Sequence, residues 1–388
     1  MKINEKFREI YGVNPERTFF SPGRINIIGD HIDYNGGKVF PAALDMGTYG
    51  AFRKCDDRIL SMYSDNFSEA GVIHVNLDEI EYKPEYLWCN YVLGVIYALE
   101  KNGYKITSGL DMCIAGNIPY GSGLSSSASL ELLCIYAISS MFDFGIDRIQ
   151  MALIGQIAEN EFCMVNSGIM DQFAVAMGQA SSAILLDTHS LEYSYVPINL
   201  SDSTFVICCT NKKRGLKDSK YNERRMECER ALSIIKTVNE YSHIKNLCEL
   251  TSKDLVNIYP VLNDDILSKR VRHVVTENER TYGVIDAFAT GNLMEVGRLM
   301  QSSDISLRDD YEVTGRELDA IYEGAMRSSG IIGSRMTGAG FGGCNISLVY
   351  NKYLEEFKET AGDYYKKTIG YDASFFEAKI GDGVRELL

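Results

Sequence analysis

Apolar residues in the first 80 positions occur in short runs that are separated by Gly, Asn and Asp. This pattern is typical of strands joined by turns, and it predicts strands at 17–20, 49–53, 59–63 and 72–75. The spacing changes near residue 85: from Trp88 to Leu99 the apolar residues recur every three or four positions, and Asn102-Gly103 follows them. A helix over 85–102 is therefore predicted.

The same two patterns alternate along the rest of the chain. Helical spacing predicts helices at 124–142, 148–162 and 219–237 and through most of 253–328. Strand-like runs are found at 109–115, 182–186, 194–197, 205–210 and 345–350. Each half has strands followed by helices, which favours an α+β fold with two domains. We place these domains at 1–200 and 201–388.

The composition narrows the class of protein. Of the 388 residues 45% are apolar, and 39 basic against 53 acidic residues give a net charge of −14. Such an acidic surface argues against nucleic-acid binding through a general basic field, although a local site can still bind a small anion. The longest apolar stretch, 132–142, is too short to span a bilayer, and the N-terminal segment lacks the apolar core of a signal peptide. We expect a cytoplasmic protein with no membrane and no nucleic-acid partner.

Ten cysteines are spread along the chain, without a CxxC pair or a Cys/His cluster at zinc spacing. Most of them lie inside apolar runs. These features predict buried free thiols in a reducing compartment.

A first candidate for chemistry is PYGSGLSSSAS, residues 119–129. A turn rich in small residues runs directly into a helical pattern, so free backbone N–H groups and the positive helix end would meet near Gly123 and Ser127. Serine hydroxyls add donors and potential metal ligands, which suits a triphosphate. The segment has no Gly-Lys-Ser/Thr and is not a Walker A loop. An ordinary Ser-capped helix remains the alternative.

A second candidate is the glycine cluster MTGAGFGGC, residues 336–344. So many glycines indicate a close approach to another group or a positive φ angle. The cluster contains a literal GxGxxG, but a dinucleotide fingerprint needs a strand before it and a helix after it. Here we expect a helix before and a strand after, so we reject that interpretation. A tight connecting turn remains the alternative.

Two further segments gather carboxylates. SPGRINIIGDHIDYNGG, residues 21–37, places Arg24, Asp30, His31 and Asp33 within ten positions, which suits hydrogen bonds to a polyol and stabilisation of a phosphoryl group. Farther along, Glu159 and Asp171 lie twelve positions apart in AENEFCMVNSGIMDQF. One carboxylate could hold a metal while the other meets a substrate hydroxyl. A solvated turn and two surface acids are the respective alternatives.

Together, these motifs and their order resemble those of the galactokinases, a family of the GHMP small-molecule kinases. PGRINIIGDHIDYNGG is similar to the family signature PGRVNLIGEHTDYNGG, and PYGSGLSSSAS is similar to the superfamily phosphate loop. SGIMDQF resembles CGIMDQ, and SKYNERRMECE resembles S-x-Y-x-x-R-R-x-x-C-E. MTGAGFGGC matches the third superfamily motif. The resemblance therefore covers nearly the whole chain.

The resemblance implies a two-domain α+β fold with the active site between the domains. It implies transfer of the γ-phosphoryl group of ATP, with Mg²⁺, to the anomeric hydroxyl of D-galactose, the first committed step of galactose catabolism. The product would be α-D-galactose 1-phosphate. The partners would be small-molecule substrates, and we expect a monomer or a weak homodimer.

Site residues follow from the resemblance position by position. Asp171 and Arg24 match the catalytic residues, and Ser127 and Glu159 match the positions expected to hold magnesium. The sugar-contacting positions are Asp30, His31, Asp33, Gly168 and Tyr221. The nucleotide-binding positions are Gly121, Ser122, Gly123, Leu124, Ser125, Ser126, Ser127 and, beside the adenine, Trp88.

The chain departs from the family pattern at three positions. Asp30 stands where the family has Glu, Ile32 stands where it has Thr, and Ser167 stands where it has Cys. These changes leave open a kinase of a related sugar, such as N-acetylgalactosamine or arabinose. A galactose-sensing regulator without turnover is a further alternative, which the intact Ser127-Ala128, Arg24 and Asp171 disfavour.

Overall fold

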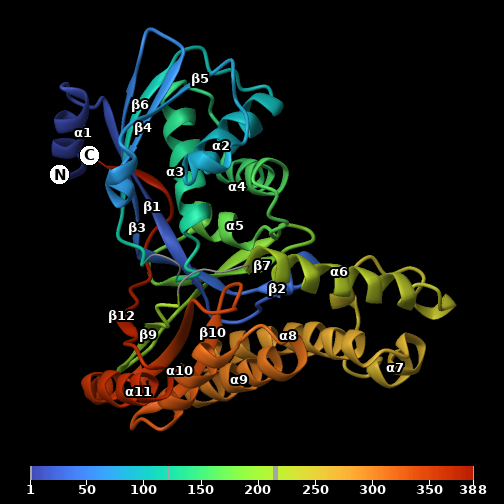
Figure 1. Cartoon of the computed structure of the whole chain (residues 1–388). Helices are drawn as coiled ribbons and strands as arrows, with labels where there is room; N and C mark the ends of the chain where they lie inside the picture. Colours follow the sequence, from blue (N-terminus) through green and yellow to red (C-terminus); the bar gives the residue numbers. More distant parts are fainter. Residues whose placement is uncertain (1, 120–121, 213–216, 388) are drawn as a thin grey trace.

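The computed structural model describes residues 2–119, 122–212 and 217–387, and it contains three sheets (Figure 1). The upper part is built on a six-stranded sheet with the order β13-β1-β3-β6-β4-β5. Its strands are β1 (Arg17–Asn26), β3 (Pro41–Lys54), β4 (Ile59–Ser64), β5 (Ile73–Asn76), β6 (Leu110–Gly116) and β13 (Arg385–Leu387).

Helices cover both faces of this sheet. On one face α1 (Lys2–Tyr11) buries Ile3 and Phe7 against β3, β4 and β6. The other face carries the main apolar core beneath α2 (Cys89–Lys101), α3 (Ser126–Met141), α4 (Arg148–Ile157) and α5 (Met170–Met177). Helix α3 is apolar almost all round because it lies between the sheet and the other helices. This packing between the sheet and the other helices fixes the direction of α3, and so the position of its start at Ser126.

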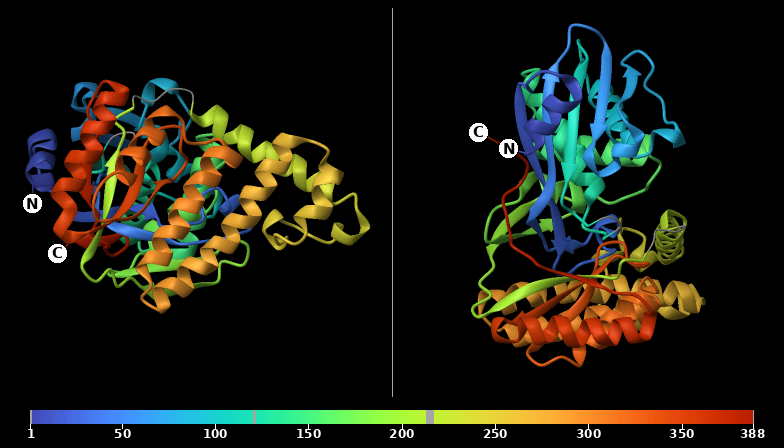
Figure 2. Two further views of the ribbon diagram at one scale, coloured as in Figure 1. Left: turned by 90° about the horizontal axis from the view of Figure 1, so that it is seen from below. Right: turned by 60° about the vertical axis from the view of Figure 1, so that its left-hand side comes forward.

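The lower part is built on a four-stranded sheet with the order β10-β11-β9-β12 (Figure 2). Its strands are β9 (Ser203–Cys209), β10 (Ile331–Thr337), β11 (Cys344–Tyr350) and β12 (Ser374–Glu377). The helices of this part are α6 (Lys217–Ile235), α7 (Leu255–Leu262), α8 (Asp265–Ala289), α9 (Leu293–Ser306), α10 (Arg316–Met326) and α11 (Leu354–Ile369). Helices α6 and α7 and the start of α8 extend sideways from the body (Figure 1).

Two features connect the upper and lower parts. A small sheet of β2 (Lys38–Val39), β7 (Ser182–Asp187) and β8 (Tyr193–Pro197) lies between them. The end of the chain then returns to the upper part, where β13 pairs antiparallel with β1 (Figure 2). The division at 200/201 falls between β8 and β9, and it stays a prediction. Among the described residues, none of the helices combines the length and apolar character needed to cross a membrane.

Short helical turns complete the chain. Within the described ranges, π-turns lie at Ala158–Phe162 after α4 and at Leu307–Tyr311 after α9. Single turns of 3-10 helix lie at Asp33–Asn35, Pro84–Tyr86, Asn239–Tyr241, Leu247–Glu249 and Asn351–Tyr353, and Asp65–Ala70 contains two such turns joined across a kink at Phe67. The helix expected over 85–102 therefore begins only at Cys89, and the one expected over 148–162 ends in a π-turn. Turns of the π type are frequent at functional sites.

The structure corrects the expected surroundings of the glycine cluster 336–344. Strand β10 precedes the cluster, where a helix was expected, and strand β11 follows it. The strand was missed because Gly333 and the buried Arg335 interrupt its apolar pattern; Gly333 packs on Gly297, where a side chain would not fit. With no helix after the cluster, the dinucleotide interpretation still fails.

The structure also corrects the expectation that every cysteine is a free thiol. Cys209 at the end of β9 and Cys344 at the start of β11 are opposite each other in the sheet and form a disulfide. Their separation of 135 residues gave no sequence signal, because antiparallel pairing alone brings them together. The remaining cysteines are free.

Candidate active site

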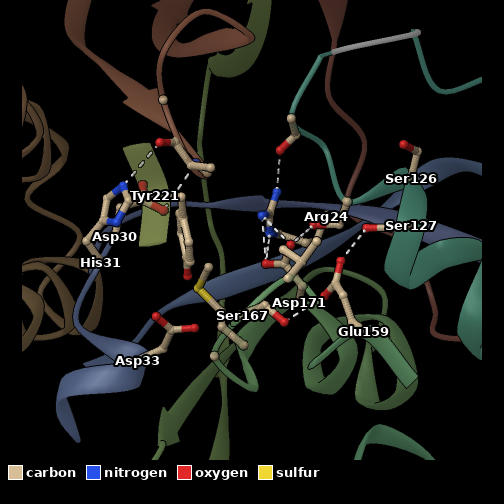
Figure 3. A pocket seen from close by; sticks show the side chains of 18 of the residues that line it. Arg24, Asp30, His31, Asp33, Ser126, Ser127, Glu159, Ser167, Asp171 and Tyr221 are labelled. Atoms are coloured by element: carbon tan, nitrogen blue, oxygen red, sulfur yellow. Dashed lines mark hydrogen bonds and ion pairs between the residues drawn. The ribbon is translucent and has the colours of Figure 1, made fainter. Parts of the chain in front are cut away.

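A cavity of about 200 Å³ lies where the upper and lower parts meet. Strand β1 and the loop after it form one wall, and the starts of α3 and α5 form another. Tyr221 of α6 and the glycines after β10 close the remaining side. Figure 3 shows Asp33, His31 and Tyr221 toward one end and Ser127 and Glu159 toward the other, with Arg24 and Asp171 between them. Segments far apart in the sequence thus share one cavity.

The centre of the cavity holds an ion pair between Arg24 and Asp171. Arg24 lies on β1 with 3% of its surface exposed, and its Nε and Nη2 donate to the two carboxylate oxygens at 2.8 and 2.7 Å. Its Nη1 donates to the Gly123 carbonyl at 2.8 Å. Asp171 belongs to the first turn of α5, and Ser125 also donates to it. The two-point contact fixes the carboxylate in one orientation.

The start of α3 forms the phosphate side of the cavity. Gly123 and Ser125 take left-handed conformations, with φ of 77° and 61°, just before the first helical residue. The Leu124 carbonyl accepts a hydrogen bond from the Arg24 backbone N–H at 3.2 Å, which ties this loop to β1. Ser126 is exposed, and both Ser126 and Ser127 line the cavity. The free N–H groups and positive end of a 16-residue helix suit an anion here.

Glu159 is the carboxylate beside this helix start. It lies in the π-turn after α4 and is 7% exposed. Its Oε1 accepts from Ser127 at 3.0 Å, and its Oε2 accepts from Ser167 at 2.7 Å and from Gln172 at 2.8 Å. Burial raises the pKa of Glu159. Hydroxyl and carboxylate oxygens are the donors that Mg²⁺ prefers, so this pair fits such an ion.

The protein offers few ligands at this position. No group of three or more His, Cys, Asp or Glu side chains with metal-binding geometry exists in the part of the chain that the structure describes. A Mg²⁺ ion bound through one or two protein oxygens usually completes its shell with phosphates and water. The donor set therefore fits a metal that arrives with a nucleotide.

The opposite end of the cavity is formed by Asp33, Gly168 and Tyr221. Gly168 passes so close to Asp33 that it leaves no room for a side chain. Desolvation and the neighbouring Asp171 raise the pKa of Asp33 to about 7. Burial raises the pKa of Tyr221 well above its usual range, so the phenol keeps its proton. A carboxyl group and a phenol hydroxyl supply both acceptors and a donor for sugar hydroxyls.

His31 is part of the cavity wall, but both of its ring nitrogens already have protein partners. Nδ1 pairs with the Tyr34 hydroxyl at 2.8 Å, and Nε2 pairs with the Ala339 carbonyl at 3.2 Å. A carbonyl only accepts, so Nε2 carries the hydrogen and Nδ1 accepts from Tyr34. Burial lowers the pKa of His31 to about 3, which keeps the ring neutral. His31 thus fastens the glycine cluster to the loop after β1.

Asp30 is equally engaged. It is 1% exposed, its Oδ2 accepts from Arg335 at 2.6 Å, and its Oδ1 accepts from the Gly338 N–H at 3.1 Å. Arg335 is fully buried, and its second carboxylate neighbour is Glu277 at 3.8 Å. Gly338 needs to be glycine, because a Cβ atom would come 2.7 Å from the Gly123 carbonyl and φ is +83°. This close approach confirms the expectation drawn from the glycine cluster.

The lining of this cavity includes only some of the expected nucleotide-binding residues. Ser122, Leu124 and Trp88 do not line it, and Gly121 lies outside the described residues. Trp88 is 8% exposed and packs in the main core; within the described ranges its Nε1 has no hydrogen-bond partner. The adenine position of Trp88 stays a prediction.

Sequence reasoning missed the residues that hold the cavity wall from behind. These are Gln172, Glu131, Arg335 and Glu277, each with no more than 1% of its surface exposed. A weak signal existed for Glu131, a lone acid within the apolar run of α3. A charge in such a run is costly unless it has a partner.

Comparison with known protein families and structures assigns this fold to a known class. The galactokinase galactose-binding signature matches residues 5–54, the GHMP kinase N-terminal domain matches residues 90–179, and the GHMP kinase C-terminal domain matches residues 284–367. A mevalonate kinase of Methanococcus jannaschii has the same fold, with a TM-score of 0.64, 18% identity and coverage of 94% of this chain and 98% of that one. The fold is therefore that of the GHMP kinases.

More similar proteins define the family. A galactokinase of Clostridium perfringens is 49% identical over 99% of this chain and 99% of its own length. A galactokinase of Streptococcus thermophilus is also 49% identical, over 100% of this chain and 99% of its own length. The structure of Lactococcus lactis galactokinase complexed with galactose superimposes with a TM-score of 0.96 at 46% identity, covering 100% of this chain and 99% of that one. The chain belongs to the galactokinase family.

Proposed function

We propose that this kinase transfers the γ-phosphoryl group of ATP to the anomeric hydroxyl of D-galactose, giving α-D-galactose 1-phosphate and ADP. The observation that carries the proposal is the position of the Arg24–Asp171 pair. It lies between a helix start suited to phosphates and a polar end suited to a sugar. A hydroxyl and a phosphoryl group would therefore meet beside a carboxylate and a guanidinium.

Phosphoryl transfer depends mostly on positioning and on stabilising spread charge. Asp171 is proposed to accept the hydrogen of the attacking hydroxyl and so to direct its oxygen toward the phosphorus. Arg24 is fixed by Asp171 and the Gly123 carbonyl, so its positive charge stands beside the group in transfer without reorganisation. The same ion pair keeps the two catalytic groups at a constant separation.

The phosphates are proposed to bind the start of α3, with the backbone of Gly123, Ser125, Ser126 and Ser127. Ser127 and Glu159 would hold Mg²⁺. The ion would supply charge neutralisation for the β- and γ-phosphate oxygens. Gly121, Ser122, Leu124 and Trp88 complete the proposed nucleotide site.

The sugar is proposed to bind Asp33, Gly168 and Tyr221, beside His31 and Asp30. Asp33 and Tyr221 offer an acceptor and a donor for neighbouring hydroxyls. Because both His31 nitrogens are engaged, its contribution is to hold the wall and not to donate a hydrogen bond to the sugar. Asp30 is likewise held by Arg335, which places it in the wall.

The experiment that tests this function is ADP release with Mg-ATP over a sugar panel. The panel is galactose, N-acetylgalactosamine, glucose, arabinose and no sugar. Turnover on galactose far above the others is expected. Preference for another sugar would keep the mechanism and overturn the substrate, and binding of galactose without turnover on any sugar would overturn the activity.

We further propose that the protein acts on small molecules in the cytoplasm. Its two domains would comprise residues 1–200 and 201–388. We expect it to be a monomer or a weak homodimer. The acidic charge disfavours a nucleic-acid partner, and the burial of most free cysteines favours a reducing compartment, whereas the Cys209–Cys344 disulfide is unusual for such a compartment. Light scattering across a concentration series gives the oligomeric state, and a stable higher oligomer would contradict it.

A further inference from the structure

A buried amide connects two carboxylates behind the phosphate side of the cavity. Gln172 follows Asp171 on α5, and none of its surface is exposed. Its Nε2 donates to Glu159 Oε2 at 2.8 Å and to Glu131 Oε2 at 3.1 Å. An amide nitrogen has two hydrogens, so these two contacts use both of them.

The contacts of Glu159 divide its two oxygens. Oε2 accepts from the buried Gln172 amide and from Ser167, which lines the cavity. Oε1 faces Ser127 at the cavity. Partners on the outer oxygen of a metal-binding carboxylate commonly fix its orientation, and losing such a partner weakens metal binding about 10- to 100-fold.

Glu131 has no place in the proposed chemistry, yet it is fully buried in α3. It is one turn after Ser127 on the same helix, so both face α5 and the π-turn. Within the described ranges, the Oε1 of Glu131 has no hydrogen-bond partner. Burial raises the pKa of Glu131 well above its usual range. Its Oε2 supports the Gln172 amide from behind.

We propose that Gln172 is a positioning residue: its amide, supported by Glu131, holds Glu159 Oε2 so that Oε1 faces Ser127 and the divalent cation of the nucleotide complex. The inference rests on the proposed function, because it takes Ser127 and Glu159 as the cation site. Gln172 itself touches neither substrate nor cation. It acts by fixing the rotation of one carboxylate.

The test is Gln172→Met, which keeps much of the volume and removes both donors. Binding of Mn²⁺ in the presence of a non-hydrolysable ATP analogue is measured by the EPR signal of the free ion. We expect the Kd for Mn²⁺ to rise about tenfold. Galactose affinity, measured by calorimetry without nucleotide, should stay within twofold. A matched control is Gln301→Met on α9, outside the cavity, which should change neither quantity.

If Gln172→Met does not fold, Gln172→Leu carries the same measurement, because leucine also offers no hydrogen to either carboxylate. Unchanged Mn²⁺ binding in a folded variant would overturn the positioning role while leaving the proposed function standing. Absence of Mn²⁺ binding in the unmodified protein with the nucleotide analogue would instead overturn the proposed cation site, and this inference with it.

Discussion

Gly168 lies against Asp33 so closely that a Cβ atom on residue 168 would come 1.8 Å from Asp33 Oδ2. Gly168→Ala must therefore displace the Asp33 carboxyl or the loop before α5. Since both belong to the proposed sugar site, we expect KM for galactose to rise at least about tenfold, with a loss of about 1–3 kcal/mol in the free energy of unfolding. Steady-state kinetics and thermal unfolding measure the two effects.

Gly116→Ala is the matched control for this change. Gly116 ends β6, and a Cβ atom there would make only ordinary contacts, at 3.7 Å or more. We expect KM for galactose to remain unchanged in this variant. An unchanged KM in Gly168→Ala as well would remove Gly168 and Asp33 from the sugar site.

Asp171→Asn separates catalysis from binding. The amide keeps the size of the side chain and an oxygen for the Arg24 guanidinium, but it cannot accept the hydrogen of the attacking hydroxyl in the same way. We expect kcat to fall by about 10²- to 10⁴-fold, with galactose affinity by calorimetry within a few-fold of the unmodified protein. A kcat near that of the unmodified protein would exclude Asp171 as the catalytic carboxylate.

Asp304 gives a pH dependence of stability that is separate from the cavity. It is 2% exposed on α9, accepts from the Met336 N–H at 2.9 Å, and burial raises its pKa from 3.8 to about 7. Between these values the folded protein holds a proton that the unfolded chain has lost, so this group's contribution to stability falls as pH rises through about 7. Asp304→Asn removes the titration. Relative to the unmodified protein, we expect the variant to have a higher Tm at pH 8 than at pH 5. The corresponding difference in the free energy of unfolding is on the order of 1–3 kcal/mol.

Asp309→Asn is the control for that measurement. Its neighbour Arg308, at 2.8 Å, lowers the pKa of Asp309, so the carboxylate is ionised at both pH values. The Tm change of this variant should be equal at pH 5 and pH 8. A pH-independent difference for Asp304→Asn would show that this carboxyl does not titrate between them.

Sugar discrimination should depend on the polar end of the cavity. Asp33 and Tyr221 would lose a partner when a hydroxyl changes its configuration, and an unpaired buried polar group is costly. We expect kcat/KM for glucose to be at least about 10²-fold below that for galactose. Tyr221→Phe should reduce the ratio of kcat/KM for galactose to that for glucose. Comparable values for the two sugars in the unmodified protein would contradict the proposed recognition.

The elements that the sequence predicted well are those whose pattern is local. The long apolar repeat of 124–142 corresponds to α3 (Ser126–Met141), and the charged repeat of 219–237 corresponds to α6 (Lys217–Ile235). Strands β12 (Ser374–Glu377) and β13 (Arg385–Leu387) were not predicted. They are short and lie at sheet edges, and β13 is a strand only because β1, more than 350 residues earlier, pairs with it.

In the candidate site, too, the sequence indicated the residues that lie in a local motif and missed those that do not. The motifs around Arg24, Ser127, Glu159 and Asp171 each contain a local signal, glycine and small residues beside a charged or hydroxyl group, and this drew attention to them. The residues behind them, such as Gln172 and Arg335, carry no such signal. These residues act through hydrogen bonds to carboxylates that lie 13 positions away in the sequence for Gln172 and 305 positions away for Arg335.

By itself the sequence determined the alternation of strands and helices, the acidic charge, the glycine-rich turns and the family resemblance, because each depends on nearby residues or on motif order. Only the tertiary structure decided that Arg24 faces Asp171, that Asp30 is held by Arg335, and that Cys209 meets Cys344. Those are contacts between distant segments. Their geometry exists only once the sheets have paired and the upper and lower parts have closed around one cavity.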